Sequence, residues 1–113
     1  MSTHAKLSAN HRAKYRNPIA VVAGESVILG IRDVDWPEFI WATDPRGRSG
    51  WVHQSCLRDA VAVRDYDARE LDANAGDEVR LIELLGGWWW AENQIGERGW
   101  LPERVLAIEP GMK

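Results

Sequence analysis

The feature that most constrains this chain of 113 residues is a repeat of about 50 residues within it. Gly24–Leu29 and Gly76–Leu81 share a glycine, an acidic residue, a valine and a leucine at matching positions, with an offset of 52. Gly47–Val52 matches Gly96–Leu101 with an offset of 49. The three-residue difference indicates an insertion around Val34–Glu38 of the first copy, where we expect a loop. The sequence therefore predicts two related units.

Each copy has the pattern of short strands joined by tight turns, and a hairpin is expected in both. Asp44–Gly47 has Asp, Pro and Gly where a type I turn favours them, and it joins Phe39–Thr43 to Arg48–His53. Its counterpart in the second copy is Asn93–Gly96, which follows Trp88–Glu92. These segments predict the same two-stranded element in each unit.

The remaining pattern indicates an all-β fold. Val27, Leu29 and Ile31 alternate with their neighbours, as in a strand with one buried face. No segment shows a sustained helical period, so helix content should be low. Four or five short strands cannot form two full sheets, which favours a small barrel. We therefore expect two five-stranded barrels in tandem, packed closely because only Arg58–Asp59 separates their strands.

The repeat also predicts domain boundaries. We expect a flexible N-terminal tail at residues 1–6 and a first, more divergent domain at residues 7–58. The second domain should cover residues 60–109, and residues 110–113 should form a C-terminal tail.

Seven tryptophans are unusual for a chain of this length. Strand alternation places Trp88 and Trp90 on one face and Trp89 on the other, so at least one ring must leave the core. Trp41 and Trp51 recur in the second copy as Trp90 and Trp100, which favours a packing role for all four. Trp36 lies in the insertion, where it is either an interdomain wedge or an exposed contact.

Charge is distributed unevenly along the sequence. Residues 1–59 carry a net charge of +2 and residues 60–113 carry −5, which gives −3 overall. The first sixteen residues are basic, which is typical of a solvated tail or loop. A phosphate-binding arm would need aromatic interleaving and a basic domain behind it, and neither is present at strength, so a nucleic-acid partner is not expected. The N-terminus has no apolar signal segment and no stretch is long enough to span a bilayer. We expect a cytoplasmic protein without a membrane partner.

No motif in the sequence indicates an enzymatic function. The three histidines are scattered without the spacing of a metal site, and one cysteine excludes an internal disulfide. Cys56 follows His53 by three residues, but it aligns with Val105, which predicts a packed thiol. We expect no catalytic residues, no bound metal and no cofactor.

Four motifs of the second copy, in order and at matching spacings, resemble those of a Src-homology-3 (SH3) domain. They are Ala62–Ala68 at the opening, Gly76–Val79 after the RT loop, the Trp pair in Gly87–Trp89, and Gly99–Pro102. In this copy the RT loop lies between Ala68 and Glu70 and is about three residues shorter than in the family. Glu70-Leu71 also follows the family pattern. The first copy is more divergent, and the whole chain is similar to tandem variant SH3 proteins of bacteria.

The resemblance implies recognition of proline-rich peptides in the polyproline II form, which is stiff before binding and so loses little entropy on docking. By matching positions, the groove residues are Tyr66, Trp88 and Pro102. The acidic residues that would select a basic ligand residue are Asp67, Glu70 and Asp72. The net charge of −5 in this half would also attract a basic segment.

Both copies depart from the family pattern. In the second copy, Arg64 and Val105 stand where the family has tyrosines. In the first copy, the corresponding groove positions are His11, Phe39, His53 and Cys56, with Trp36 as a further candidate.

The sequence thus predicts a non-enzymatic protein that binds a protein or peptide segment, including proline-rich or basic ones, through Trp-lined barrel faces. Two alternatives stay open. The chain could be a structural or accessory subunit, or a homodimer, with the Trp faces buried in a permanent complex. It could also be a cell-wall-binding module related to bacterial SH3 domains, which would require export.

Overall fold

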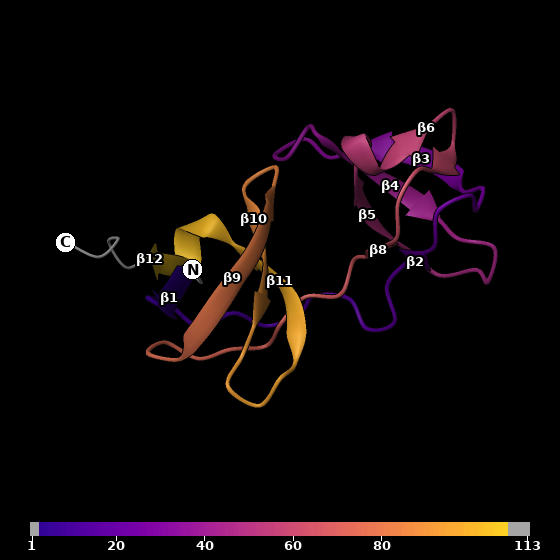
Figure 1. Cartoon of the computed structure of the whole chain (residues 1–113). Helices are drawn as coiled ribbons and strands as arrows, with labels where there is room; N and C mark the ends of the chain where they lie inside the picture. The colour runs from indigo at the N-terminus through magenta and orange to yellow at the C-terminus, as the bar shows by residue number, and fades with distance from the viewer. Residues whose placement is uncertain (1–2, 109–113) are drawn as a thin grey trace. The chain divides into compact units, whose positions relative to one another are not determined.

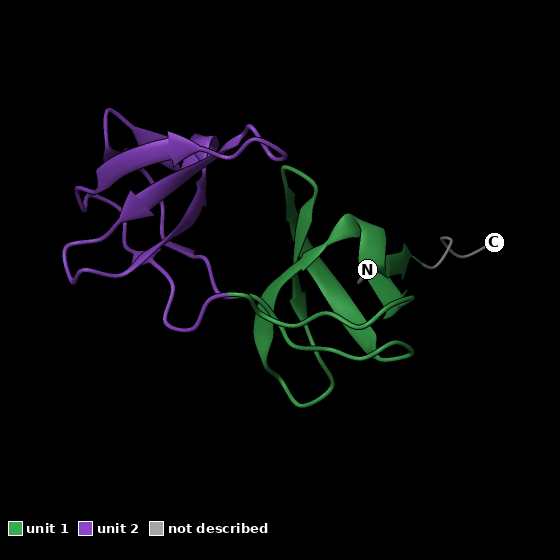
Figure 2. Ribbon diagram, turned by 180° about the vertical axis from the view of Figure 1, so that it is seen from behind, with its two compact units in different colours: residues 1–14, 70–113 green, residues 15–69 purple. Residues whose placement is uncertain are grey.

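The chain folds into β-structure with two short 3-10 turns, seen in a computed structural model that describes residues 3–108 (Figure 1). It divides into two compact units (Figure 2). Unit 1 is built from residues 1–14 and 70–113, and unit 2 from residues 15–69. The chain therefore leaves unit 1 after residue 14 and returns to it at residue 70.

Unit 1 contains a five-stranded sheet in the order β11-β10-β9-β1-β12. The strand bounds are β1 Thr3–Leu7, β9 Glu78–Leu85, β10 Trp88–Glu92, β11 Arg98–Pro102 and β12 Leu106–Ile108. All neighbours are antiparallel, and the 3-10 turn Glu103–Val105 separates the last two strands. Ala5 lies at the centre of the sheet, opposite Val79 on one side and Ile108 on the other.

The core of unit 1 is apolar and comes from both ends of the chain. Its buried members are Ala5, Leu7, Leu71, Ala73, Val79, Leu81, Ala91, Leu101 and Val105. Trp89 packs against this cluster, whereas Trp88 and Trp90 alternate to the other face of β10, as the strand period predicts.

Unit 2 has the same hairpin elements in a smaller set of sheets. A three-stranded sheet in the order β3-β4-β5 is accompanied by the two-stranded pairs β2-β8 and β6-β7. The bounds are β2 Ala20–Val21, β3 Ile28–Arg32, β4 Phe39–Thr43, β5 Ser49–His53, β6 Leu57–Arg58, β7 Val61–Ala62 and β8 Tyr66–Asp67. Its buried residues include Ile19, Ala42, Val52 and Cys56, so the expected packed thiol is confirmed.

A tight hairpin joins β6 to β7 and replaces the expected linker between domains. Arg58 pairs with Val61, and the two residues between them, Asp59 and Ala60, have φ of 51° and 65°. Two consecutive positive φ angles are the geometry of a type I′ hairpin turn. Arg58–Asp59 therefore lies within unit 2, and the prediction that it connects two domains is wrong.

The two copies of the repeat have exchanged their opening segments. In unit 1, Leu7 donates its N–H to Asp77 O at 2.9 Å. The equivalent bond in unit 2 runs from Ala62 N–H to Glu25 O at 2.8 Å. Unit 1 thus takes its first strand from the start of the chain, and unit 2 takes its first strand from the residues after its own last strand.

The compact units consequently differ from the expected domains. Residues 3–6 belong to β1 and pair with β9 and β12, so they are not a flexible tail. Residues 60–69 group with unit 2, although the repeat places them at the start of the second copy. The physical reason is that similar opening segments can complete either unit. The hairpin at Asp59 and Ala60 folds the opening segment of the second copy onto unit 2. Residues 110–113 lie outside the described residues.

Other local expectations have mixed outcomes. Both predicted hairpins are confirmed, to within a residue at their ends. The predicted buried face of Val27, Leu29 and Ile31 is wrong beyond its first residue: Val27 is buried, but Leu29 is 46% and Ile31 is 73% exposed. The cause is that β3 pairs only with β4, whereas its counterpart β9 has a strand on each side. Within residues 3–108, neither unit closes into a continuous barrel.

The exchange makes a prediction about fragments. A peptide of residues 15–69 should fold cooperatively, because it contains every segment of unit 2. A peptide of residues 70–113 should be unfolded, because it lacks β1 and the other opening segment, and addition of a peptide of residues 1–14 should restore β-structure. Circular dichroism and thermal unfolding measure both effects. Cooperative folding of residues 70–113 alone would contradict the dependence of unit 1 on β1.

Candidate functional site

The sheet face of unit 1 that lies opposite the core carries a ladder of aromatic cross-strand pairs. Trp88 pairs with Pro102, and Trp90 pairs with Trp100, whose ring centroid lies 5.2 Å away. Trp100 and Pro102 are buried, while Trp88 and Trp90 are half-buried. We call these four residues, with His11, the unit 1 face.

His11 reaches this face from the N-terminal segment. Its backbone is held by two hydrogen bonds to Ala73, of 2.8 and 2.9 Å. Its ring lies edge-on to Trp88 at 5.9 Å, and Nε2 is 2.8 Å from Glu70 Oε1. The sequence assigns His11 to the first unit, but the structure brings it beside the second copy's Trp88 and Glu70, at the position where the repeat aligns Tyr66.

A glycine lets the segment after residue 69 lie directly against β11. Glu70 forms a parallel bridge with Trp100, and Leu71 donates its N–H to Trp100 O at 3.1 Å. A Cβ on Gly99 would lie 2.6 Å from Leu71 N, which is backbone and cannot move aside. The glycine before Trp100 is therefore required by close packing, not by an unusual φ.

The predicted acidic residues are divided between the units. Glu70 contacts His11, and Asp72 Oδ1 accepts the N–H of Ala13 at 2.7 Å, so both lie in unit 1. Asp67 belongs to unit 2, where it accepts the N–H of Arg69 at 2.9 Å. The structure therefore does not gather the three carboxylates at one groove.

Unit 2 has an equivalent face built from Phe39–His53 and Trp41–Trp51 pairs. The ring centroids are 5.2 Å apart in the first pair and 5.0 Å in the second. Tyr66 belongs to this face, because its hydroxyl donates to Trp51 O at 3.1 Å. Phe39, His53 and Tyr66 are each 7% exposed, so the groove positions of unit 2 are closed.

Polar contacts fix the imidazole of His53. Nε2 lies 2.7 Å from Glu38 Oε1, and Nδ1 lies 2.8 Å from Ser55 Oγ. The ring is thus held by its neighbours on both nitrogens. Trp36 is half-buried in the insertion, where its backbone N–H donates to Asp33 Oδ1 at 3.0 Å. Its role as an interdomain wedge or an exposed contact stays a prediction.

Sequence reasoning missed one aromatic residue of unit 2. Tyr15 packs edge-on to Trp41 at 5.3 Å. It lies in the basic lead-in, which we expected to be solvated, and an aromatic residue among those cations was the available signal.

The exchange also redistributes charge. Unit 1 contains seven Lys and Arg against nine Asp and Glu, a net charge of −2. Unit 2 contains seven against eight, a net charge of −1. Residues 60–113, which carry −5 together, are therefore divided between the two units, and neither unit is strongly acidic. The net charge of −5 no longer supports the predicted attraction of a basic segment.

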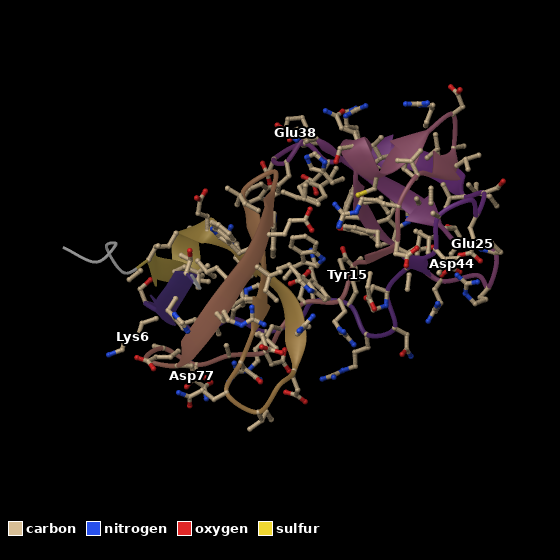
Figure 3. All side chains as sticks on the ribbon, in the orientation of Figure 1. Lys6, Tyr15, Glu25, Glu38, Asp44 and Asp77 are labelled. Carbon is tan, nitrogen blue, oxygen red and sulfur yellow. The ribbon has the colours of Figure 1, made fainter. Side chains whose placement is uncertain are left out.

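Carboxylates with lowered pKa lie in charged clusters that support the hairpins. Hydrogen bonds from Arg46, followed by the Val22 N–H, lower the pKa of Glu25 from its ordinary value of 4.5 to about 2. In the same cluster, burial raises the pKa of Asp44, but the N–H groups of Arg48, Ala20 and Arg46 outweigh it and lower the pKa overall (Figure 3). Hydrogen bonds from Arg80 and Arg98 lower the pKa of Glu92 in unit 1.

Asp44 and Asn93 hold equivalent turns. Asp44 Oδ1 accepts the N–H groups of Arg46 and Arg48, at 2.9 and 3.0 Å. Asn93 Oδ1 does the same for Ile95 and Glu97, at 3.1 and 2.9 Å. This shared side-chain turn explains why the two hairpins could be predicted from sequence.

Two classes of site are not found in the part of the chain that the structure describes. Residues 3–108 contain no group of three or more His, Cys, Asp or Glu side chains placed to hold a metal ion. They also contain no helix with the length and hydropathy needed to cross a bilayer.

In a comparison with known protein families, residues 59–109 match the variant SH3 domain. The human protein "SH3 and PX domain-containing protein 2A" (Homo sapiens) is 29% identical over 80 residues, which cover 65% of this chain and 7% of that protein. This chain therefore spans only a small part of that relative. No solved structure gives a significant match. The matched range begins at Asp59, so its first residues lie in unit 2 and the rest in unit 1.

The two equivalent glycines make a matched pair for a stability test. Gly99→Ala places a Cβ against the backbone of Leu71 and should lower the free energy of unfolding by about 2 kcal/mol or more. Gly50→Ala meets first the Ile19 Cγ2 methyl, at 2.9 Å, which can rotate, so its cost should be smaller. Urea denaturation measures both, and equal costs would contradict the assigned contacts.

The lowered pKa values predict acid sensitivity. A carboxylate with a depressed native pKa stabilises the fold above its unfolded pKa, and this stabilisation is lost as the pH falls toward the native value. For Glu25, the loss should occur between pH 4.5 and about 2. Glu25→Gln and Arg46→Gln should each reduce the fall in melting temperature over that range. Profiles identical to wild type would show that this pair is not formed.

Proposed function

We propose that the chain is a non-enzymatic peptide-binding protein that uses the unit 1 face. SH3 domains commonly act as protein-interaction modules, which supports this class of function for residues 59–109. The observation that carries the proposal is the half-buried ring of Trp88, fixed between Pro102 on the neighbouring strand and the edge of His11. A rigid, partly exposed indole is the kind of residue that dominates binding energy at interfaces.

The mechanism follows from the shape of the face. Trp88 and Trp90 present half-buried, flat apolar rings on rigid strands, with few rotamers to immobilise when a ligand binds, and the buried Trp100 supports them. A proline-rich segment in the polyproline II form is equally rigid before binding, so both partners lose little conformational entropy. In unit 2, Phe39 stands at the position of Trp88 and is only 7% exposed, so we assign binding to unit 1.

A second candidate is assembly into a homodimer or a larger complex. It is favoured by β3, on which Ile28 and Ile31 are each 73% exposed on a strand paired along one edge. Static light scattering of the full chain separates this from a monomeric binding protein, because the apparent mass of an assembly exceeds 12.8 kDa.

The proposal is tested by titrating the full chain with a library of proline-rich dodecapeptides while following tryptophan fluorescence. Trp88→Ala should weaken the best peptide by about tenfold or more, since truncation of a hot-spot residue costs about 2 kcal/mol. Trp41→Ala, which removes a half-buried tryptophan from the face of unit 2, is the matched control and should leave the affinity unchanged. Equal affinities for wild type and Trp88→Ala, or no binding of any peptide, would refute the assignment.

A further inference from the structure

We propose that the unit 1 face takes proline-rich or aliphatic segments that need no basic anchor residue, because the N-terminal segment neutralises the acidic side of the RT loop. The inference rests on the peptide-binding function proposed above and specifies the ligand class of that same face. It follows from which copy of the repeat supplies each half of this loop.

The exchange changes the composition of the loop. In unit 1, the first half is residues 8–14 and the second half begins at residue 70. The second copy's own first half would have brought Asp65 and Asp67, but these residues lie in unit 2. Their place is taken by a segment that contains Arg12 and Lys14 and no acidic residue. Acidic residues at this site therefore come from one half of the loop only.

Glu70 is the first of these acidic residues, and His11 contacts one of its carboxylate oxygens. The Nε2–Oε1 distance is 2.8 Å, and the Glu70 side chain is 18% exposed. The backbone of Glu70 is also fixed by its bridge to Trp100. A ligand cation that approaches Oε1 would have to displace the imidazole, and the gain from exchanging one hydrogen-bonded partner for another is small, so only the other oxygen of this largely buried carboxylate is left for a direct pair.

Asp72 is the second acidic residue, and the same segment compensates it. One carboxylate oxygen accepts the N–H of Ala13, which lies between Arg12 and Lys14 in sequence. The Arg12 guanidinium is fixed next to Asp72 in the chain, because it donates to Ala73 O at 2.8 Å and to Asn74 Oδ1. A positive charge held on the backbone of the next residue, Ala73, reduces the attraction of Asp72 for a second cation, even without a direct ion pair.

Among the other carboxylates near the face, Glu83 lies opposite Trp90 in the sheet, and Glu92 and Glu103 have basic neighbours. Glu92 lies at the end of the same ladder and forms ion pairs with Arg80 and Arg98, at 2.7 and 3.1 Å. Glu103 follows Pro102 and is exposed, and Arg104 is next to it on the same 3-10 turn. What the face offers a ligand is therefore aromatic surface with little net field, which suits proline and aliphatic side chains.

The test compares two proline-rich peptides that differ only by Arg or Gln at one position outside the prolines. Dissociation constants are measured by tryptophan fluorescence on the full chain, at about 10 mM and about 150 mM salt, because screening weakens exposed charge pairs. We expect the two affinities to agree within about twofold at both salt concentrations. An Arg peptide that binds about fivefold or more tightly at low salt overturns the inference.

Three variants locate any preference. Glu70→Gln and Asp72→Asn keep an oxygen that can accept the existing hydrogen bonds and should leave both affinities within about twofold of wild type. Arg12→Gln removes the compensating charge and should raise the preference for Arg to about threefold, as expected for an exposed ion pair. An unchanged preference in Arg12→Gln overturns the compensation. If neither peptide nor any other proline-rich peptide binds, the proposed function fails, and the inference fails with it.

Discussion

The fold of unit 1 depends on the antiparallel pairing of β1 with β9 and β12. Ala5 is 1% exposed and lies opposite Val79 and Ile108, so this one strand fills the gap between the two halves of the sheet. The same pairing fixes the residues that follow it. Ala75 donates its N–H to Asn10 Oδ1 at 2.7 Å. The next two residues, His11 and Arg12, contact the second half of the loop at Ala73. The proposed binding face is therefore a product of strand pairing at the start of the chain.

Local features were predictable because their causes lie within a few residues. The hairpins follow from Asp44 and Asn93, whose side chains accept the N–H groups of the residues two and four positions later. The division of the three consecutive tryptophans between two faces follows from the period of a strand. The cross-strand pairs of Trp41 with Trp51 and of Trp90 with Trp100 agree with their recurrence in both copies.

The assignment of opening segments to units was not predictable in the same way. Similarity between the copies identifies equivalent positions but not which copy completes which sheet, because either segment has the pattern to pair. The deciding geometry is the two-residue turn at Asp59 and Ala60, and alanine is rare at the positive φ that this turn requires. This is also why His11, Glu70 and Trp88 were identified as candidates but placed in different domains. The exposed β3 has a related cause, since it pairs only with β4 and the opening segment contacts its start through a single bridge, Ser26 with Val61.

In sequence, unit 2 lies between the two segments that form unit 1, and this order has a consequence for biosynthesis. Leu7 pairs with Leu106, about 100 residues later in the chain, and such distant pairing slows folding. During translation, all of unit 2 is synthesised before the strands that pair with β1. β1 is thus made well before its partners β9 and β12, and the nascent chain carries it unpaired until they follow.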